Sequence, residues 1–303
     1  MSRLQVFREV VAQGSFSAAA DTLDYSQSAV SQAIATLEGE AGTALIERTR
    51  GGARPTPAGA ALVAHASGVL AQIQAAESEL EAIASGRGGS VRVASFPTAG
   101  ATLMPQAVAG FRASHPGVEL SLAEGEPEEI APRLRAGEFD LALLFEFEET
   151  SERLGTGLRR FDLLDDPLHL ALPRDHRLAD RKRIALADLA AEAWIQTSAA
   201  SPCARHVVRS CHAAGFEPRV SFESDDYQTV QGLVAAGVGV ALIPQLALSA
   251  VHPEILVRPL DPQTPSRRVF AATSRSGATP ALATMLDVLR DAGRRAEAER
   301  LPK

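Results

Sequence analysis

Four short polar side chains recur at helical spacing near the start of the chain. Gln27 and Ser31 are four residues apart, as are Ser28 and Gln32, so on a helix all four share one face. Glutamine can bond adenine bidentately in the major groove of DNA, and serine can bond a base edge or a phosphate. The alternative interpretation is an ordinary solvated helix face.

An arginine-rich ribbon follows this segment. In ERTRGGARPTP, Arg48, Arg50 and Arg54 place three positive charges within seven residues. The intervening glycines allow the backbone to approach a partner closely, so the ribbon can bind phosphate or enter a minor groove. Together with a short helix and a tight turn before Ser26, the ribbon favours a winged helix-turn-helix that binds double-stranded DNA.

Helical periodicity defines the elements that must position these side chains. Apolar residues from Leu4 to Val11 predict a first helix that ends at Gly14, and a second helix spans 18–23. Ser26 can cap a third helix over 27–40.

An alanine-rich stretch over 58–84 predicts one long helix. Its larger apolar residues repeat at heptad spacing, which indicates a dimerisation seam. The alternative is an amphipathic helix packed on its own domain. A flexible hinge over 85–90 follows. The seam residues that we expect to contact a second copy are Leu62, Val69, Ile73 and Leu80.

From residue 91 onward, short apolar runs alternate with helical segments. This alternation predicts an α/β domain with mainly parallel sheets. The predicted strands are 91–94, 118–123, 140–145, 168–172, 194–196, 219–222, 240–243 and 267–273. The predicted helices are 101–114, 128–136, 203–214, 226–236 and 278–299.

Composition sets broad limits on the class of protein. The 303 residues predict about two domains, and 46% hydrophobic with 22% charged residues is typical of a soluble globular protein. A net charge of −7 does not favour nucleic acid, so DNA binding must depend on local arrangement. Two cysteines fit a reducing compartment. With neither a signal peptide nor a membrane-spanning apolar run in the sequence, we expect a cytoplasmic protein without membrane association.

Catalytic motifs are missing from the sequence. We find no G-x-S-x-G elbow, P-loop or cluster of metal ligands, and GVGVAL over 237–242 is a weak glycine motif in the wrong context. We therefore expect no enzyme activity, catalytic residue, cofactor or metal. A solute-binding protein is a second alternative, which the N-terminal helix-turn-helix disfavours.

The segment FSAAADTLDYSQSAVSQAIATLEGEAGTALIERT, with the later TPAG, resembles the N-terminal signature of LysR-type transcriptional regulators. The resemblance covers the whole chain, including SDDYQTVQGLVAAGVGVALIP. It implies a homodimer, often a homotetramer, that binds an interrupted palindromic promoter site. It also implies an effector domain of two Rossmann-like lobes, similar to periplasmic binding proteins, with a small molecule between them.

By position, the resemblance assigns base-facing roles to Gln27, Ser28, Ser31 and Gln32. It places Arg48, Arg50 and Arg54 in the wing. Ser28 stands where many members have proline, and Gln32 where many have arginine, so we expect a different operator preference. The domains implied are 1–57 (winged helix-turn-helix), 58–84 (linker helix), 85–90 (hinge) and 91–303 (effector domain). Within the last, lobe 1 is 91–161 with 267–303 and lobe 2 is 162–266.

Strand ends and helix N-termini meet in a cleft between two α/β lobes, where free N–H groups suit a small ligand. Thr98 matches a ligand-contacting position of the family, although Thr98, Ser201 and Asp226 can equally be helix caps. Phe145 occupies a position where carboxylate-binding members can hold arginine, which favours a neutral or cationic effector over a simple polyacid. The candidate effector residues are Thr98, Glu126, Phe145, Thr197, Ser198, Ser201, Cys203, Phe222 and Asp226.

The two cysteines leave a redox alternative open. Cys203 and Cys211 lie eight residues apart in a stretch that resembles the peroxide sensors of the same family. On one continuous helix this spacing rises about 12 Å, whereas a disulfide needs Cα atoms within about 7 Å. The alternative is two inert buried thiols.

These features together predict a mechanism. Paired recognition helices enter successive major grooves, and ligand binding shifts the lobes or subunits. The change alters DNA spacing or bending and thereby the access of RNA polymerase.

Overall fold

The computed structural model describes residues 2–49, 52–85, 89–148, 154, 156–181, 183–274 and 279–298. At positions 48, 49, 64, 67, 71, 72, 74, 75, 78, 79 and 81–85 it describes the backbone alone. The predicted wing residue Arg50 and the side chain of Arg48 therefore lie outside the described part. The backbone divides into two compact units, whose longest continuous segments are 1–92 and 141–303.

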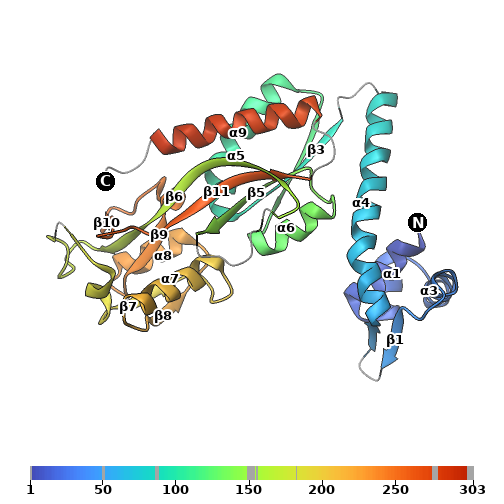
Figure 1. Cartoon of the computed structure of the whole chain (residues 1–303), viewed down its shortest axis with the longest axis horizontal. Coiled ribbons are helices and arrows are strands. Elements are labelled where there is room, and N and C mark those ends of the chain that lie inside the picture. Colours follow the sequence, from blue (N-terminus) through green and yellow to red (C-terminus); the bar gives the residue numbers. More distant parts are fainter. Residues whose placement is uncertain are drawn as a thin grey trace. The chain divides into compact units, whose positions relative to one another are not determined.

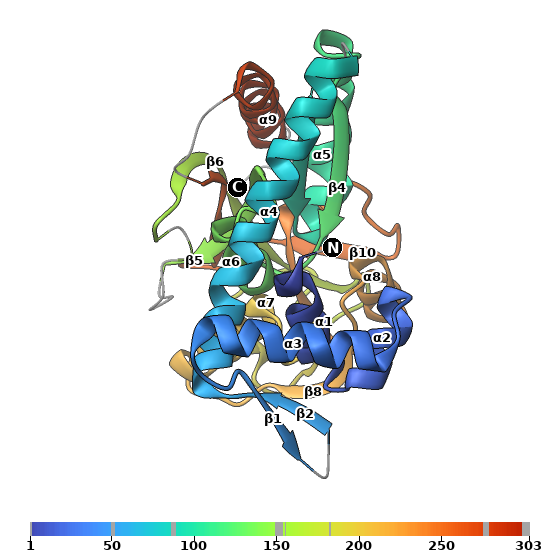
Figure 2. The ribbon, with the colours of Figure 1, turned by 90° about the vertical axis from the view of Figure 1, so that its right-hand side faces the viewer.

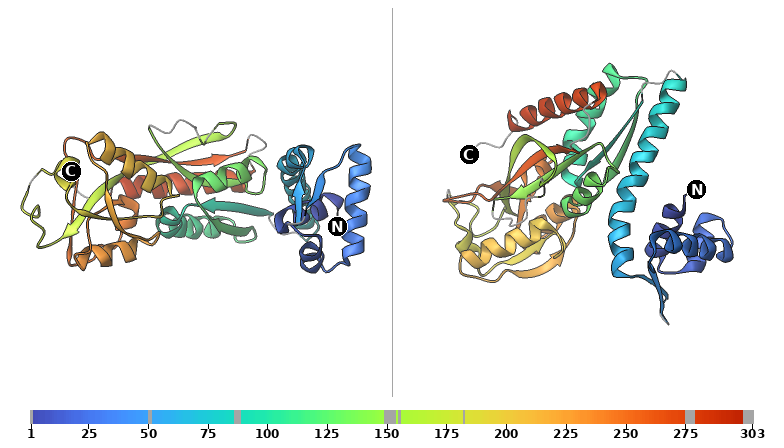
Figure 3. Two further views of the ribbon diagram at one scale, coloured as in Figure 1. Left: turned by 90° about the horizontal axis from the view of Figure 1, so that it is seen from below. Right: turned by 45° about the vertical axis from the view of Figure 1, so that its right-hand side comes forward.

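Three short helices precede one long helix in the N-terminal unit (Figures 1 and 3). Each short helix begins after a serine whose Oγ accepts a hydrogen bond from a backbone N–H of the first turn, and each ends at a residue in the left-handed region. The predicted helices are confirmed. Their bounds are α1 (Arg3–Gln13), α2 (Phe16–Leu23), α3 (Gln27–Ala41) and α4 (Pro57–Ser85).

A two-stranded antiparallel ribbon, β1 (Ile46–Thr49) and β2 (Gly52–Pro55), separates α3 from α4 (Figure 2). Glu38 on α3 fixes its start, because Oε1 accepts hydrogen bonds from the backbone of Leu45 and Ile46 at 2.7 and 3.1 Å. The ribbon is thereby tied to the third helix.

The TPAG motif forms the junction between the ribbon and α4. Thr56 Oγ1 donates to the carbonyl of Ala44 at 2.8 Å and accepts from the N–H of Gly59 at 3.0 Å. A Cβ added at Gly59 would lie 2.0 Å from the Leu45 carbonyl oxygen, so only glycine fits there. The motif thus closes the helical unit on itself.

The C-terminal unit, by which we mean the residues described from 89 onward, is α/β, although segments 117–121 and 131–140 group with the first compact unit. Its main sheet has the strand order β10-β6-β11-β5-β3-β4, with β9 also paired to β6, and β7 and β8 form a separate pair. The strands are β3 (Ser90–Ser95), β4 (Glu119–Glu124), β5 (Leu141–Phe147), β6 (Arg159–Pro173), β7 (Ala193–Gln196), β8 (Arg219–Glu223), β9 (Ala241–Pro244), β10 (Ile255–Arg258) and β11 (Ser266–Thr273). The helices are α5 (Pro97–Ser114), α6 (Pro127–Arg135), α7 (Pro202–Ala213), α8 (Tyr227–Ala235) and α9 (Pro280–Ala298), with short 3-10 helices η1 (Leu186–Leu189) and η2 (Gln245–Leu248).

One long strand, β6, joins the two halves of the main sheet. β6 pairs with β11 up to Pro167 and with β9 from Leu168 onward, so one strand serves both halves of the main sheet. β11 runs antiparallel to both β5 and β6, whereas β3 pairs with β5 and β7 with β8 in parallel. The expectation of mainly parallel sheets therefore holds only in part. α9 and α5 lie side by side along one face of the main sheet (Figure 1).

Most predicted strand and helix bounds agree with the structure within two residues, with three exceptions. The predicted strand 168–172 is only the last part of β6, α5 begins at Pro97 rather than Ala101, and β10 was not predicted. Among the described residues, no helix is long and apolar enough to cross a membrane.

Candidate functional site

The predicted recognition helix presents its polar side chains outward. Gln27, Ser28 and Gln32 are exposed and Ser31 is half-buried, while Val30 and two further apolar residues of α3, Ile34 and Leu37, lie in the core. The predicted orientation of this face is confirmed. Its contacts with DNA stay a prediction.

Serine at position 28 has a specific local role. Its Oγ lies 2.9 Å from Oγ of Ser26, the N-cap of α3, which accepts the N–H of Ala29 at 3.2 Å. The hydroxyl of Ser28 is therefore held at the positive end of the helix, where a phosphate is favoured.

The wing presents one described arginine to solvent. Arg54 is exposed on β2, opposite Glu47 on β1. Ala53 donates its backbone N–H to the Gly14 carbonyl at 2.7 Å, which fixes β2 against the turn between α1 and α2. The Arg54 side chain thus projects from an anchored strand.

The predicted seam on α4 has two parts. Val69, Ile73 and Leu80 are 46%, 49% and 67% exposed, which is unusual for large apolar side chains on a helix. Leu62 instead packs in part against the core of the N-terminal helices. The alternative of packing within the domain therefore applies to Leu62, and the other three residues remain uncovered in the single chain.

A buried ion pair lies at the centre of the C-terminal unit. Arg267, at the start of β11, is 2% exposed, and Asp166 on β6 is completely buried. Nε and Nη2 of Arg267 lie 2.9 and 2.8 Å from Oδ2 of Asp166, and Oδ1 accepts the N–H of Leu246 at 3.0 Å. The aspartate neutralises the guanidinium and is itself fully hydrogen-bonded.

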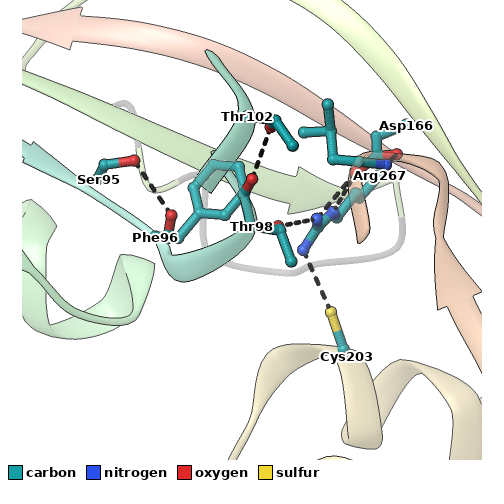
Figure 4. A network of polar contacts seen from close by, with 8 residues as sticks. Ser95, Phe96, Thr98, Thr102, Asp166, Cys203 and Arg267 are labelled. Atoms are coloured by element: carbon teal, nitrogen blue, oxygen red, sulfur yellow. Dashed lines mark hydrogen bonds and ion pairs between the residues drawn. The ribbon is translucent and has the colours of Figure 1, made fainter. Parts of the chain in front are cut away.

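The same guanidinium contacts residues from both predicted lobes (Figure 4). Its Nη2 donates to Oγ1 of Thr98 at 2.6 Å, and its Nη1 approaches Sγ of Cys203 at 3.5 Å. It also lies over the rings of Phe145 and Phe96, at 4.4 and 4.9 Å from their centroids. Three of the predicted effector residues, Thr98, Phe145 and Cys203, therefore meet at one arginine.

Polar atoms without a partner surround this arginine network. Glu126 Oε2, Gln196 Oε1 and Thr197 Oγ1 are buried and have no hydrogen-bond partner in the described part of the chain. Gln196 and Thr197 share a cavity of about 10 Å³ with Cys203 and Tyr227. Buried polar groups normally have partners, so these three atoms mark a place for a ligand or water.

Burial controls the ionisation of this region. Desolvation raises the pKa of Glu126, although the positive charge of Arg267 acts in the opposite direction. Burial likewise raises the pKa of Cys203 and, to a large extent, that of Tyr227 beside it. The site therefore favours neutral side chains around one compensated ion pair.

Four predicted effector residues do not reach the Arg267 network. Ser201 caps α7 and Asp226 caps α8, as the capping alternative predicts, and a ligand contact by either residue stays a prediction. Ser198 donates its N–H to Asp225 at 2.9 Å. Phe222 is 44% exposed on β8. For Thr98 the capping alternative is wrong, because Phe96 is the N-cap of α5 and the Thr98 hydroxyl bonds Arg267.

Sequence reasoning missed Arg267 and Asp166. Each has a neighbour of the same charge, Arg268 and Asp165, and strand alternation implies that one member of each pair faces inward. Glu146, the acidic residue that follows Phe145, lies in β5 and forms an ion pair with Arg160.

The two cysteines lie on one helix, α7, as free and buried thiols. Burial raises the pKa of Cys211 to about 12. Because the thiolate is the reactive form, both sulfurs are poor nucleophiles in this conformation.

Comparison with known proteins assigns both parts of the chain. Residues 1–60 match the model described as "Bacterial regulatory helix-turn-helix protein, lysR family", and residues 84–294 match the "LysR substrate binding domain". The chain is 34% identical to the "Probable HTH-type transcriptional regulator LrrA" of Synechococcus elongatus, over 96% of each protein. It is 30% identical to the "Hydrogen peroxide-inducible genes activator" of Dickeya chrysanthemi, over 77% of this chain and 75% of that protein.

Solved structures share the fold over nearly the whole length. CbnR, a LysR family transcriptional regulator, matches with a TM-score of 0.68 at 24% identity, covering 96% of this chain and 98% of that one. Full-length OxyR from Pseudomonas aeruginosa matches with a TM-score of 0.65 at 25% identity, covering 95% and 96%. The chain therefore belongs to the LysR family of transcriptional regulators, which are not enzymes, and joins a DNA-binding helix-turn-helix to an effector-binding α/β domain.

Proposed function

We propose that a small molecule controls this regulator by binding at the Arg267 network, between Thr98 in one predicted lobe and Cys203 in the other. The observation that carries the proposal is the set of unpartnered buried atoms, Glu126 Oε2, Gln196 Oε1 and Thr197 Oγ1, next to that network. A ligand that bonds these atoms recovers interactions that the free protein lacks.

The charges around the site favour a neutral or cationic polar effector. Asp166 already compensates Arg267, so a carboxylate ligand finds no free positive charge there. Phe96 and Phe145 add apolar surface. The cavity of about 10 Å³, which residues of lobe 2 line, has room for about one water, so an effector requires more space than this cavity offers.

Calorimetric titration of the full-length protein with a panel of small neutral, cationic and dicarboxylate metabolites tests this proposal. Thr98→Val and Thr197→Val should weaken a neutral or cationic ligand, because each removes one hydroxyl that contacts or faces it. Ser249→Ala, at the C-terminal end of η2, is the matched control. Tight binding of a dicarboxylate that is insensitive to both valine variants would contradict the proposed site.

For DNA we propose that α3 reads base edges through Gln27, Ser28, Ser31 and Gln32, and that Arg48, Arg50 and Arg54 bind the backbone. A homodimer formed through Val69, Ile73 and Leu80 of α4, assembled further into a tetramer, presents paired recognition helices to a promoter and affects RNA polymerase there. The exposed polar face of α3 supports this assignment.

Fluorescence anisotropy with promoter fragments tests the contacts. Gln27→Ala should cost about 1–3 kcal/mol at one base position, whereas Arg54→Ala should weaken binding to every sequence and lower its salt dependence. Thr22→Ala, at an exposed position of α2, is a control that should leave both unchanged. Unaltered base preference in Gln27→Ala would remove that residue from the interface.

Peroxide sensing through Cys203 and Cys211 is a second candidate function. It is favoured by the guanidinium of Arg267 at 3.5 Å from the Cys203 sulfur and by the peroxide-responsive relatives. The raised pKa of both thiols opposes it. Mass spectrometry after mild peroxide treatment decides between them: two unmodified thiols favour the small-molecule effector, and a disulfide or sulfenic acid favours the redox sensor.

A further inference from the structure

The three buried atoms without a partner near Arg267 are all oxygens that can accept hydrogen bonds. Glu126 supplies a carboxylate oxygen, Gln196 an amide oxygen and Thr197 a hydroxyl oxygen. Gln196 and Thr197 are only 9% and 6% exposed, so bulk water cannot freely satisfy them. An ionised carboxylate and an amide oxygen have no proton to donate, so their partner must supply N–H or O–H groups.

The carboxylates around these oxygens outnumber the cations. Asp166 is paired with Arg267, and Glu128 of α6 is paired with Arg205 of α7. Three further carboxylates have no cation within salt-bridge distance in the described part of the chain: Glu126, Glu129 and Asp225. Besides burial, the negative charges of Glu128, Asp225 and Glu129 raise the pKa of Glu126, and the positive charge of Arg267 opposes them. The surroundings of Glu126 therefore carry an excess of negative charge.

The cavity beside Gln196 and Thr197 matches one small head group. Its volume of about 10 Å³ has room for about one water, and Cys203 and Tyr227 complete its polar lining. A primary ammonium group is compact, carries three N–H donors and has no acceptor. It is thus complementary to this cavity in size, in charge and in its number of donors, whereas a carboxylate would add acceptors to a place that already has an excess of them.

Building on the effector site proposed above, we propose that the effector is a primary amine whose ammonium group enters this cavity. Its N–H groups donate to the oxygens of Gln196 and Thr197 in predicted lobe 2 and to the carboxylate of Glu126 in predicted lobe 1. Charge-assisted hydrogen bonds of this kind are about twice as strong as neutral ones. The ammonium also offsets the repulsion between Glu126 and Asp225, which belong to different predicted lobes. The rest of the effector lies outside the cavity.

Titration calorimetry of the full-length protein with three probes of similar shape tests the head group. The probes are butylamine, butan-1-ol and butyltrimethylammonium chloride, at constant ionic strength and pH 8. At this pH the amine is charged, and alkaline conditions favour the ionised form of Glu126, whose pKa burial raises. We expect butylamine to bind about tenfold or more tightly than the other two, because the alcohol lacks the charge and the trimethylammonium ion lacks N–H donors.

Variants of the chain test the residues. Glu126→Gln and Thr197→Val should each weaken butylamine about tenfold or more, because one removes the counter-charge and the other an acceptor. Glu254→Gln is the matched control, since this exposed carboxylate precedes β10, which pairs with the end of β6. Pro173 at that end is seven residues from Asp166, or about 23 Å along the strand. The control should bind butylamine as the wild type does, and urea unfolding verifies that each variant is folded.

The possible outcomes separate the head group from the site. Absence of butylamine binding at millimolar concentration overturns the ammonium proposal. Equal affinities for butylamine and butan-1-ol, both lost in Thr197→Val, reject the ammonium group and retain the effector site. Butylamine binding that neither Glu126→Gln nor Thr197→Val weakens overturns the ammonium proposal and contradicts the effector site as well.

Discussion

Replacing Asp166 with asparagine isolates the contribution of the buried ion pair. Asparagine has nearly the same shape, and its oxygen can still accept the N–H of Leu246, which now lies 3.0 Å from Oδ1. What the variant loses is the negative charge at 2.8–2.9 Å from the guanidinium of Arg267. The arginine stays 2% exposed and lacks its counter-charge.

Leaving one charge of a buried pair unpaired costs about 3–5 kcal/mol. That is a large part of the 5–15 kcal/mol by which a typical domain is stable. Arg267→Met should also destabilise the domain, because it leaves the carboxylate of Asp166 buried alone. The double variant removes both charges, so it should be more stable than the sum of the two single losses predicts, with a coupling of about 2 kcal/mol or more.

Urea unfolding followed by the fluorescence of Trp194 measures these losses in the relevant domain. This is the single tryptophan of the chain, and it lies completely buried in β7. Glu146→Gln is the matched control. It breaks the ion pair with Arg160, which is 25% exposed and keeps Asp162 as a second partner, so the loss should be smaller than for Asp166→Asn.

The result that would refute this reasoning is additivity. If Asp166→Asn and Arg267→Met lost stabilities that simply summed in the double variant, the two side chains would not interact energetically. A loss below about 1 kcal/mol for Asp166→Asn would likewise show that water or another group solvates Arg267 when the aspartate is neutralised.

Two further predictions concern the α4 seam and Glu126. Ile73→Glu places a charge at the uncovered seam, and light scattering should show a shift toward monomer, whereas Glu77→Gln on the same helix should leave the oligomer intact. Because burial raises the pKa of Glu126 above its ordinary 4.5, the protonated form is the one that folding favours. Its stabilising effect is present below pH 4.5 and lost as the pH rises through the folded-state pKa. Glu126→Gln should therefore have a higher free energy of unfolding than the wild type at about pH 8, and the difference should vanish at about pH 4. Urea titrations of both proteins across this pH range measure it. Parallel pH profiles of the two proteins would contradict the prediction.

The N-terminal helices could be predicted closely because their signals are local. Serines at the N-caps, Gly14 and Gly42 in the left-handed region, and an apolar stripe of period 3.6 all act within one or two turns. The exposed face of α3 follows from the same period. No distant contact is needed to determine it.

The centre of the effector domain could not be predicted in the same way, because its contacts are distant in sequence. Asp166 and Arg267 are 101 residues apart, and each has a neighbour of equal charge. Alternation predicts that one of each pair faces inward without indicating which one. The predicted strand 168–172 covers only the end of β6 for a related reason. The run of Asp165, Asp166 and Pro167 interrupts the apolar pattern at the point where β6 changes its pairing partner.

Under the proposed function, Arg267 is the two-state element of the effector domain. Asp166 and Arg267 are register partners on the paired strands β6 and β11, where the chain passes between the lobes, so their ion pair can persist when the lobes move. The contacts of Arg267 with Thr98 and Cys203 come from different lobes, so separation must break at least one of them. A ligand shifts the equilibrium between closed and separated lobes only by its difference in affinity for these two states. Under the proposed function, Glu126, Gln196 and Thr197 would provide that difference, since their buried polar atoms have no hydrogen-bond partner in the described part of the chain.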